Sequence, residues 1–130
     1  MFRLLLFFFS GKVIEGNKLG RAIGYPTANL QIENEDKLIP GNGVYAVEIQ
    51  NSKFKIQNLK GMMNIGVRPT INGINRVIEV NIFDFDKTIY GEILTVTLKK
   101  HLRSEKKFNG LNELKSQLAK DKQDALAALK

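Results

Sequence analysis

The sequence predicts a mainly β protein, an antiparallel β-barrel with one C-terminal helix. About six short segments rich in β-branched and aromatic residues are separated by clusters of turn residues, which is typical of a barrel. Helical periodicity occurs only from Leu111 onward. Because no helices alternate with the strands, a parallel βαβ fold is disfavoured. The 130 residues contain no repeat or linker, so we expect a single domain over 1–130.

The first strand is expected in the apolar segment at residues 4–9, continued by Val13 and Ile14. This segment is too short to span a bilayer, which needs about 20 apolar residues. It also lacks the small-residue cleavage site of a signal peptide. Since the chain has no cysteine, a reducing compartment is indicated, and we expect a cytoplasmic protein without membrane association.

The middle of the chain predicts three further strands. They are GVYAVEIQN (43–51), KFKIQNL (53–59) and GMMNIGV (61–67). The turn-rich segment RPTINGIN (68–75) is expected to end the last of them.

The next segment, RVIEVNIFDF (76–85), alternates, so that Glu79 and Asn81 share one face while Val80 and Ile82 share the other. A strand at 92–102 follows. In the last part of the chain, apolar residues recur with the spacing of one helical face, and Asn109 and Gly110 are typical of a helix start. This pattern predicts a helix over 110–129. The apolar positions of that face are 111, 114, 118, 125, 126 and 129.

The net charge of +7 permits a polyphosphate ligand, a nucleic acid or an anionic lipid surface as partner. Because His101 is the single histidine, a histidine-based metal site or a Ser-His pair is disfavoured. The segment GKVIEGNK (11–18) begins like a phosphate-binding P-loop but lacks the Lys-Ser/Thr pair and the following helix.

The glycine-bearing segment GRAIGYPTANL (20–30) is the main candidate for a site. Its glycines allow close backbone approach to an anion, and Arg21 can bind a phosphate through two parallel hydrogen bonds. On an extended segment Thr27 and Asn29 point the same way, and their oxygens suit Mg²⁺. The alternative is an ordinary loop in which both side chains cap local backbone groups.

Three further side chains carry suggestive chemistry. Glu79 lies in mid-strand, where carboxylates are uncommon, and pointing into a barrel mouth it could act as a general base; a solvent-facing position is the alternative. Phe108 beside Arg103 could stack on a planar ring, or could anchor the helix in the core.

As a set, these residues resemble the riboflavin kinase (flavokinase) family, in particular the kinase module of bacterial bifunctional riboflavin kinase/FAD synthetases. The matching elements run in family order over more than about nine-tenths of the chain. They are GKVIEGNKLGRAIGYPTANL, GVYAV, NIGVRPT, IEVNIFDFDKTIYGE and LRSEKKF before the helix.

The resemblance implies a six-stranded Greek-key barrel and transfer of the ATP γ-phosphate to the 5′-hydroxyl of riboflavin, giving FMN and ADP. It implies Mg²⁺ with ATP, Glu79 as the base, and Thr27 and Asn29 as contacts to the metal and phosphates. By position it implies a nucleotide site at Gly16, Lys18, Arg21, Gly24, Thr27, Asn29, Ile82, Asp84 and Tyr90. It likewise implies a flavin site at Arg103, Lys106 and Phe108.

The chain also departs from the family pattern. Asn81 stands where the family often has histidine, and residues 1–9 form an atypical start. No adenylyltransferase motif is present, so we expect no FAD synthesis by this chain alone, although it could be linked to such a domain in a longer protein.

Two alternative functions stay open, an impaired flavin-binding module and a small basic barrel that binds single-stranded nucleic acid. The low aromatic content disfavours the second, and no nucleic-acid partner is expected.

Overall fold

The computed structural model describes residues 7–14, 24–32, 41–51, 56–71, 73–85 and 89–130. In these residues six antiparallel strands close into a barrel in the order β1-β2-β5-β4-β3-β6, and one helix, α2 (Leu111–Ala128), follows. The predicted fold class is confirmed. The strands are β1 (Phe7–Ile14), β2 (Ala28–Gln31), β3 (Gly43–Asn51), β4 (Ile56–Thr70), β5 (Gly73–Ile82) and β6 (Ile93–Arg103).

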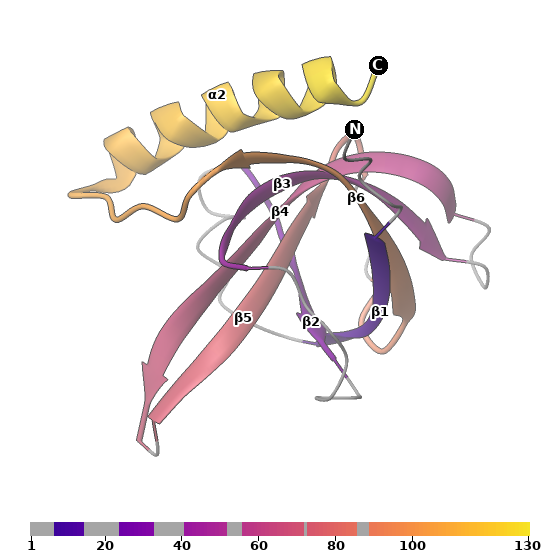
Figure 1. Cartoon of the computed structure of the whole chain (residues 1–130), viewed down its shortest axis with the longest axis horizontal. Helices are drawn as coiled ribbons and strands as arrows, with labels where there is room; N and C mark the ends of the chain where they lie inside the picture. Colours follow the sequence, from indigo (N-terminus) through magenta and orange to yellow (C-terminus); the bar gives the residue numbers. More distant parts are fainter. Residues whose placement is uncertain (1–6, 15–23, 33–40, 52–55, 72, 86–88) are drawn as a thin grey trace, which may run out of the picture.

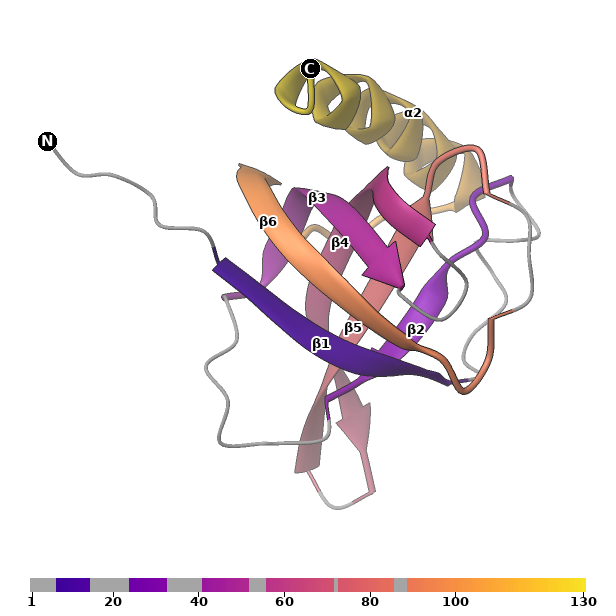
Figure 2. The same cartoon turned by 90° about the vertical axis from the view of Figure 1, so that its right-hand side faces the viewer.

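Alternation along the strands divides the apolar side chains into two clusters. The larger fills the barrel and includes Phe9, Val47, Met63, Val80 and Leu94, all fully buried. The smaller lies outside the barrel wall, where α2 packs against β3 and β4. Both views show α2 on one side of the barrel and the β4–β5 hairpin extending away from it (Figure 1, Figure 2).

The middle of the chain differs from the prediction. The described part of the strand expected at 53–59 and the strand expected at 61–67 belong to one strand, β4, which continues into the first three residues of the segment expected as a turn and ends at Thr70. Its ladder with β5 is continuous from the Gly61–Ile82 pair to the Thr70–Gly73 pair. The strand does end within the predicted turn-rich segment, but three residues later than expected, because pairing with β5 supplies the backbone hydrogen bonds of residues 68–70.

The helix begins after Gly110 as predicted, but its buried face was only partly foreseen. Ala125 and Leu129 are buried, whereas Leu111 and Leu126 are 53% and 38% exposed. Asp121, a charged residue, occupies the buried face instead, at 1% exposure. Among the described residues, no helix combines the length and the apolar character needed to cross a bilayer.

Candidate active site

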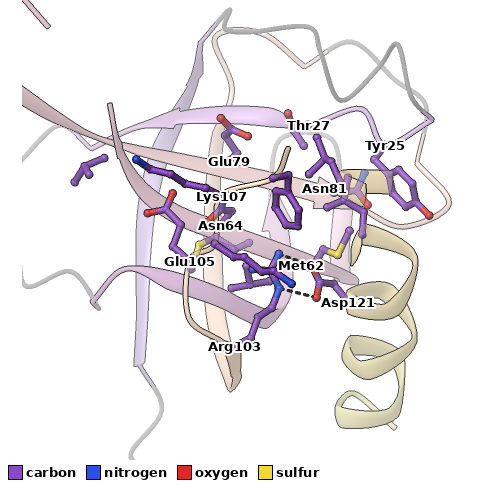
Figure 3. A pocket seen from close by; sticks show the side chains of 17 residues that line it. Tyr25, Thr27, Met62, Asn64, Glu79, Asn81, Arg103, Glu105, Lys107 and Asp121 are labelled. Carbon is purple, nitrogen blue, oxygen red and sulfur yellow. Dashed lines mark hydrogen bonds and ion pairs between the residues drawn. The ribbon is translucent and has the colours of Figure 1, made fainter. Parts of the chain in front are cut away.

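A cavity of about 620 Å³ lies outside the barrel wall, and we call it the outer cavity. Its floor is the outer face of β4 and β5, and segment 104–108 and the first half of α2 form its other walls (Figure 3). The residues just before β2 complete it. Its volume falls within the usual range of small-molecule sites, about 300–1,000 Å³.

Glu79 lies on the outer face of β5 and lines this cavity. The expectation that it points into the barrel mouth is wrong, because its strand neighbours Ile78 and Val80 take the inward positions. In register Glu79 pairs with Asn29 of β2 on one side and with Asn64 of β4 on the other. The carboxylate therefore has an amide residue beside it on each neighbouring strand.

Thr27 also lines the outer cavity, two residues before Asn29. Asn29 is 8% exposed and does not line the cavity, although its register with Glu79 puts it on the same outer face. The Nδ2 group of Asn81 donates a 2.6 Å hydrogen bond to the carbonyl oxygen of Pro26. This bond fixes the chain next to Thr27 against β5, so that Thr27 and Glu79 lie on the same side of the cavity (Figure 3).

The opposite side of the cavity contains a buried ion pair. Arg103, at the end of β6, donates from Nε and from Nη2 to the two carboxylate oxygens of Asp121, each over 2.8 Å. Gln117 donates to the same carboxylate over 2.9 Å. Because the pair joins β6 to α2, it holds the helix against the cavity (Figure 3).

Phe108 gives the cavity an aromatic surface flanked by cations. The Arg103 guanidinium carbon lies 5.8 Å from the ring centroid, and the Lys106 ammonium nitrogen lies 5.6 Å from it. Both distances are within the range of cation–π attraction. All three residues expected at a flavin site therefore meet around one cavity.

Other predicted site residues lie elsewhere. Ile82 is buried in the barrel core, while Asp84 and Tyr90 are exposed, and none of the three lines the outer cavity. Their assignment to a nucleotide stays a prediction. Gly24 is exposed and has a φ of 92°, a conformation that favours glycine. The predicted phosphate-binding residues Gly16, Lys18 and Arg21 lie outside the described residues.

Asp121 and Asn64 are among the cavity residues that the sequence analysis missed. Asp121 sits in a polar-looking stretch of α2, and its only signal was its helical spacing from Leu114, Leu118 and Ala125. Asn64 lies within NIGV, which was interpreted only as strand and as part of the family resemblance. The alternation of β4 was the signal that could have placed it opposite Glu79.

A protein-only metal site is not evident, since the described residues contain no cluster of three or more His, Cys, Asp or Glu. Thr27, Asn29 and Glu79 offer a hydroxyl, an amide and a carboxylate oxygen on one face. Such a set fits Mg²⁺ that arrives with a nucleotide, because Mg²⁺ usually takes one or two protein ligands besides phosphates and water.

The chain is similar to proteins of a known family. The family model for flavokinase, described as riboflavin kinase, matches residues 5–129. A bifunctional riboflavin kinase/FMN adenylyltransferase from Haemophilus influenzae is 44% identical over 117 residues. That match covers 90% of this chain and 37% of the relative, so the chain spans little more than a third of the relative's length.

Two solved structures share the fold. The crystal structure of a macrolide-efflux protein from Streptococcus pneumoniae has a TM-score of 0.83 and 36% identity, over 91% of this chain and 38% of that one. The crystal structure of riboflavin kinase from Trypanosoma brucei has a TM-score of 0.66 and 20% identity, over 97% of this chain and 81% of that one. At that identity the second likeness supports the barrel fold alone.

Proposed function

The chain belongs to the riboflavin kinase family, and on this premise we propose that it transfers the γ-phosphate of ATP to the 5′-hydroxyl of riboflavin. The products are FMN and ADP. The observation that carries the proposal is the outer cavity, in which Glu79 and Thr27 line one side and Arg103, Lys106 and Phe108 line another. A candidate general base and a surface for a planar ring thus share one cavity of suitable size.

Glu79 is the general base of this reaction. It acts in its ionised form and accepts the proton of the 5′-hydroxyl as that oxygen attacks the γ-phosphorus. The new oxygen–phosphorus bond forms while the bond from the γ-phosphorus to the bridging oxygen of ADP breaks. Because phosphoryl transfer depends mainly on positioning and charge stabilisation, one carboxylate on a rigid strand is enough for the proton step.

The nucleotide occupies the side of the cavity next to β2. The segment from Gly16 to Asn29 holds its phosphates, with Lys18 and Arg21 supplying positive charge and Thr27 and Asn29 supplying oxygens toward Mg²⁺. When bound, Mg²⁺ neutralises charge on the phosphates. The hydrogen bond from Asn81 to Pro26 supports this role, since it holds the end of the segment beside Glu79.

The flavin ring occupies the side next to segment 104–108. Phe108 supplies a face for stacking, and the nearby cations of Lys106 and Arg103 polarise that surface. Residues 1–130 act as one kinase domain. We assign only the kinase step to them, because the bifunctional relative is far longer than this chain.

Replacing Glu79 by glutamine tests the assignment. The side chain keeps its shape but can no longer accept the proton, so kcat should fall by about 10²–10⁴-fold. The KM values for riboflavin and ATP should stay within about threefold, because the substrates' ground-state contacts remain. Steady-state FMN formation measured by chromatography gives both quantities.

Glu48→Gln is the matched control, since Glu48 also lies in mid-strand, on β3, but pairs with Lys99 over 3.4 Å and does not line the cavity. It should leave kcat within about twofold of the wild-type value. Near-normal turnover by Glu79→Gln would exclude Glu79 as the base while leaving riboflavin kinase activity itself in place.

A further inference from the structure

Asn64 occupies the middle of the outer cavity's floor. It lies on the outer face of β4 between Met62 and Gly66, and it pairs in register with Glu79 of β5. Figure 3 shows Asn64 between the Glu79–Thr27 side of the cavity and the Arg103–Asp121 side. Paired residues on antiparallel strands have Cα atoms about 4.5–5.5 Å apart, so its amide is a direct neighbour of the Glu79 carboxylate.

The side-chain oxygen of Asn64 is buried without a hydrogen-bond donor among the described residues. A buried acceptor without a donor costs free energy of folding, because it has lost its hydrogen bonds to water. Nearly all buried polar atoms in proteins are paired, so an unpaired one calls for an explanation. At the floor of a ligand cavity, the simplest explanation is a donor on the ligand.

Segment 104–108 approaches β4 closely near Asn64. The Glu105 carboxylate lies directly against Gly66, in space that any side chain at position 66 would fill. Gly66 is two residues from Asn64 on the same face of β4. Segment 104–108 can therefore lie low over the strand, and it encloses the region around Asn64.

We propose that Asn64 binds riboflavin by accepting a hydrogen bond from a secondary hydroxyl of its ribityl chain. This assignment rests on the proposed kinase function and names a substrate contact within that site. With Glu79 receiving the proton of the 5′-hydroxyl, the amide next to it faces the following part of the same chain. Asn64 thereby selects a polyhydroxylated chain attached to the flavin ring.

The geometry disfavours the other parts of the substrates as partners of this oxygen. Phosphate oxygens are acceptors and cannot supply the missing donor. The planar flavin ring is assigned to the aromatic and cationic surface of Phe108, Lys106 and Arg103. A hydroxyl close to the reacting end of the ribityl chain is both a donor and a neighbour of Glu79.

The first test replaces Asn64 by leucine, which keeps the branched shape, is somewhat larger and removes both polar atoms. The melting temperature of the ligand-free protein should stay the same or rise, because an unpaired buried acceptor is lost. The dissociation constant for riboflavin, measured by quenching of flavin fluorescence, should rise about five- to tenfold. A purely structural asparagine would show the opposite pattern, a lower melting temperature with unchanged affinity per folded molecule.

Asn112→Leu is the matched control, since Asn112 is exposed on α2 and does not line the cavity. It should leave riboflavin affinity unchanged. Asn64→Ala provides a second, smaller side chain in case the leucine is poorly accommodated, and the same loss of affinity is expected from it.

The second test identifies the hydroxyl. The dissociation constants of the wild type and of Asn64→Leu are measured for riboflavin and for its 2′-deoxy, 3′-deoxy and 4′-deoxy analogues. For one analogue the wild type should lose about five- to tenfold in affinity, while Asn64→Leu should bind it as well as it binds riboflavin. Additive losses for all three analogues would overturn the assignment of Asn64 while leaving the kinase function intact. A folded wild type that binds no riboflavin would contradict the kinase function, and the assignment of Asn64 with it.

Discussion

The Asp121 carboxylate fixes Arg103 at the edge of the outer cavity through two hydrogen bonds of 2.8 Å. Their side chains are 2% and 20% exposed, so the pair is largely removed from water. Charge pairs of this kind contribute little net stability compared with an apolar pair of the same size, but losing one partner is costly. In this chain the pair adds a charged contact between α2 and β6 to the apolar packing of α2 on the barrel wall.

Asp121→Ala should lower the free energy of unfolding by about 2–3 kcal/mol, since it leaves Arg103 without its carboxylate. The effect should lie below the full range for buried pairs because Arg103 still reaches solvent. Chemical denaturation followed by circular dichroism measures it. Asp124→Ala is the control, since Asp124 pairs with Lys120 on the exposed helix surface and should cost about 0.5 kcal/mol or less. Equal losses for the two variants would contradict the role given to Asp121.

Tyr45 gives the stability of the barrel a dependence on high pH. It is 8% exposed and donates a 2.6 Å hydrogen bond to the carbonyl oxygen of Gly41. Burial raises the pKa of its hydroxyl above the usual value of 10.0, and the charge of Arg76 opposes part of that rise. Because the folded state disfavours the phenolate, the stability that Tyr45 contributes is present below pH 10 and is lost as the pH rises through the folded-state pKa.

Tyr45→Phe should therefore lower the free energy of unfolding by about 1 kcal/mol at neutral pH, through loss of the hydrogen bond to Gly41. Above pH 10 the difference in the free energy of unfolding between the wild type and this variant should shrink. Only the wild type has a hydroxyl at this position, and folding has to keep that hydroxyl protonated while the unfolded chain loses the proton. Urea unfolding between pH 7 and pH 11 measures the difference, and the other tyrosines are common to both proteins. A difference that is constant with pH would contradict the stated cause.

At the scale of elements, β4 is the strand on which the barrel and the outer cavity both depend. Its inward residues Met63 and Ile65 are fully buried in the core, while its outward residues Met62 and Asn64 face α2 and the cavity. Gly61 permits the close contact that keeps this strand next to β3 and β5. A Cβ atom there would lie 2.5 Å from the backbone oxygen of Asn81 and 2.8 Å from Cδ1 of Ile49.

Gly61→Ala should for this reason lower the free energy of unfolding by about 1–3 kcal/mol, since the added methyl group meets a neighbouring backbone atom that cannot easily move. Thermal unfolding measures the loss. In the control Gly41→Ala, a Cβ atom would have no neighbour within 4 Å, and the melting temperature should hardly change. If Gly61→Ala were equally harmless, the close packing of β4 against β5 would be refuted.

Local patterns predicted those elements whose residues alternate cleanly. GVYAVEIQN was predicted as the strand that the structure has at Gly43–Asn51, and the start of α2 after Gly110 was predicted as well. The long β4 was not, because RPT carries turn-type residues and only pairing with β5 makes them part of a strand. Such pairing joins residues that are distant in the sequence, so a pattern read over a few neighbouring residues cannot predict it.

The same limit applies to the site. Alternation correctly put Glu79 and Asn81 on one face and Val80 and Ile82 on the other, but it could not say which face looked inward. The barrel interior took the apolar face, so Glu79 points outward into a cavity that segment 104–108, α2 and the residues before β2 form over the wall. Asp121 and Asn64 were missed for the same reason, since their partners are distant in the sequence.

At the scale of the whole molecule, the barrel serves as a rigid wall and the site is built on its outside. Residues before β2, from β4 and β5, and from the end of β6 through α2 converge on one cavity (Figure 3). The closed barrel fixes the relative positions of the strands, because each has hydrogen-bonded neighbours on both sides. The net charge of +7 favours the approach of a polyphosphate such as ATP to the protein as a whole.

The most direct test of the central claim is the reaction of the purified chain with riboflavin, ATP and Mg²⁺. FMN and ADP, separated by chromatography over a time course, should form in equal amounts and only when ATP is present. The phosphate should be found on the 5′-oxygen of the product, the oxygen from which we propose that Glu79 accepts the proton. A folded protein that binds riboflavin but forms no FMN under these conditions would contradict the account.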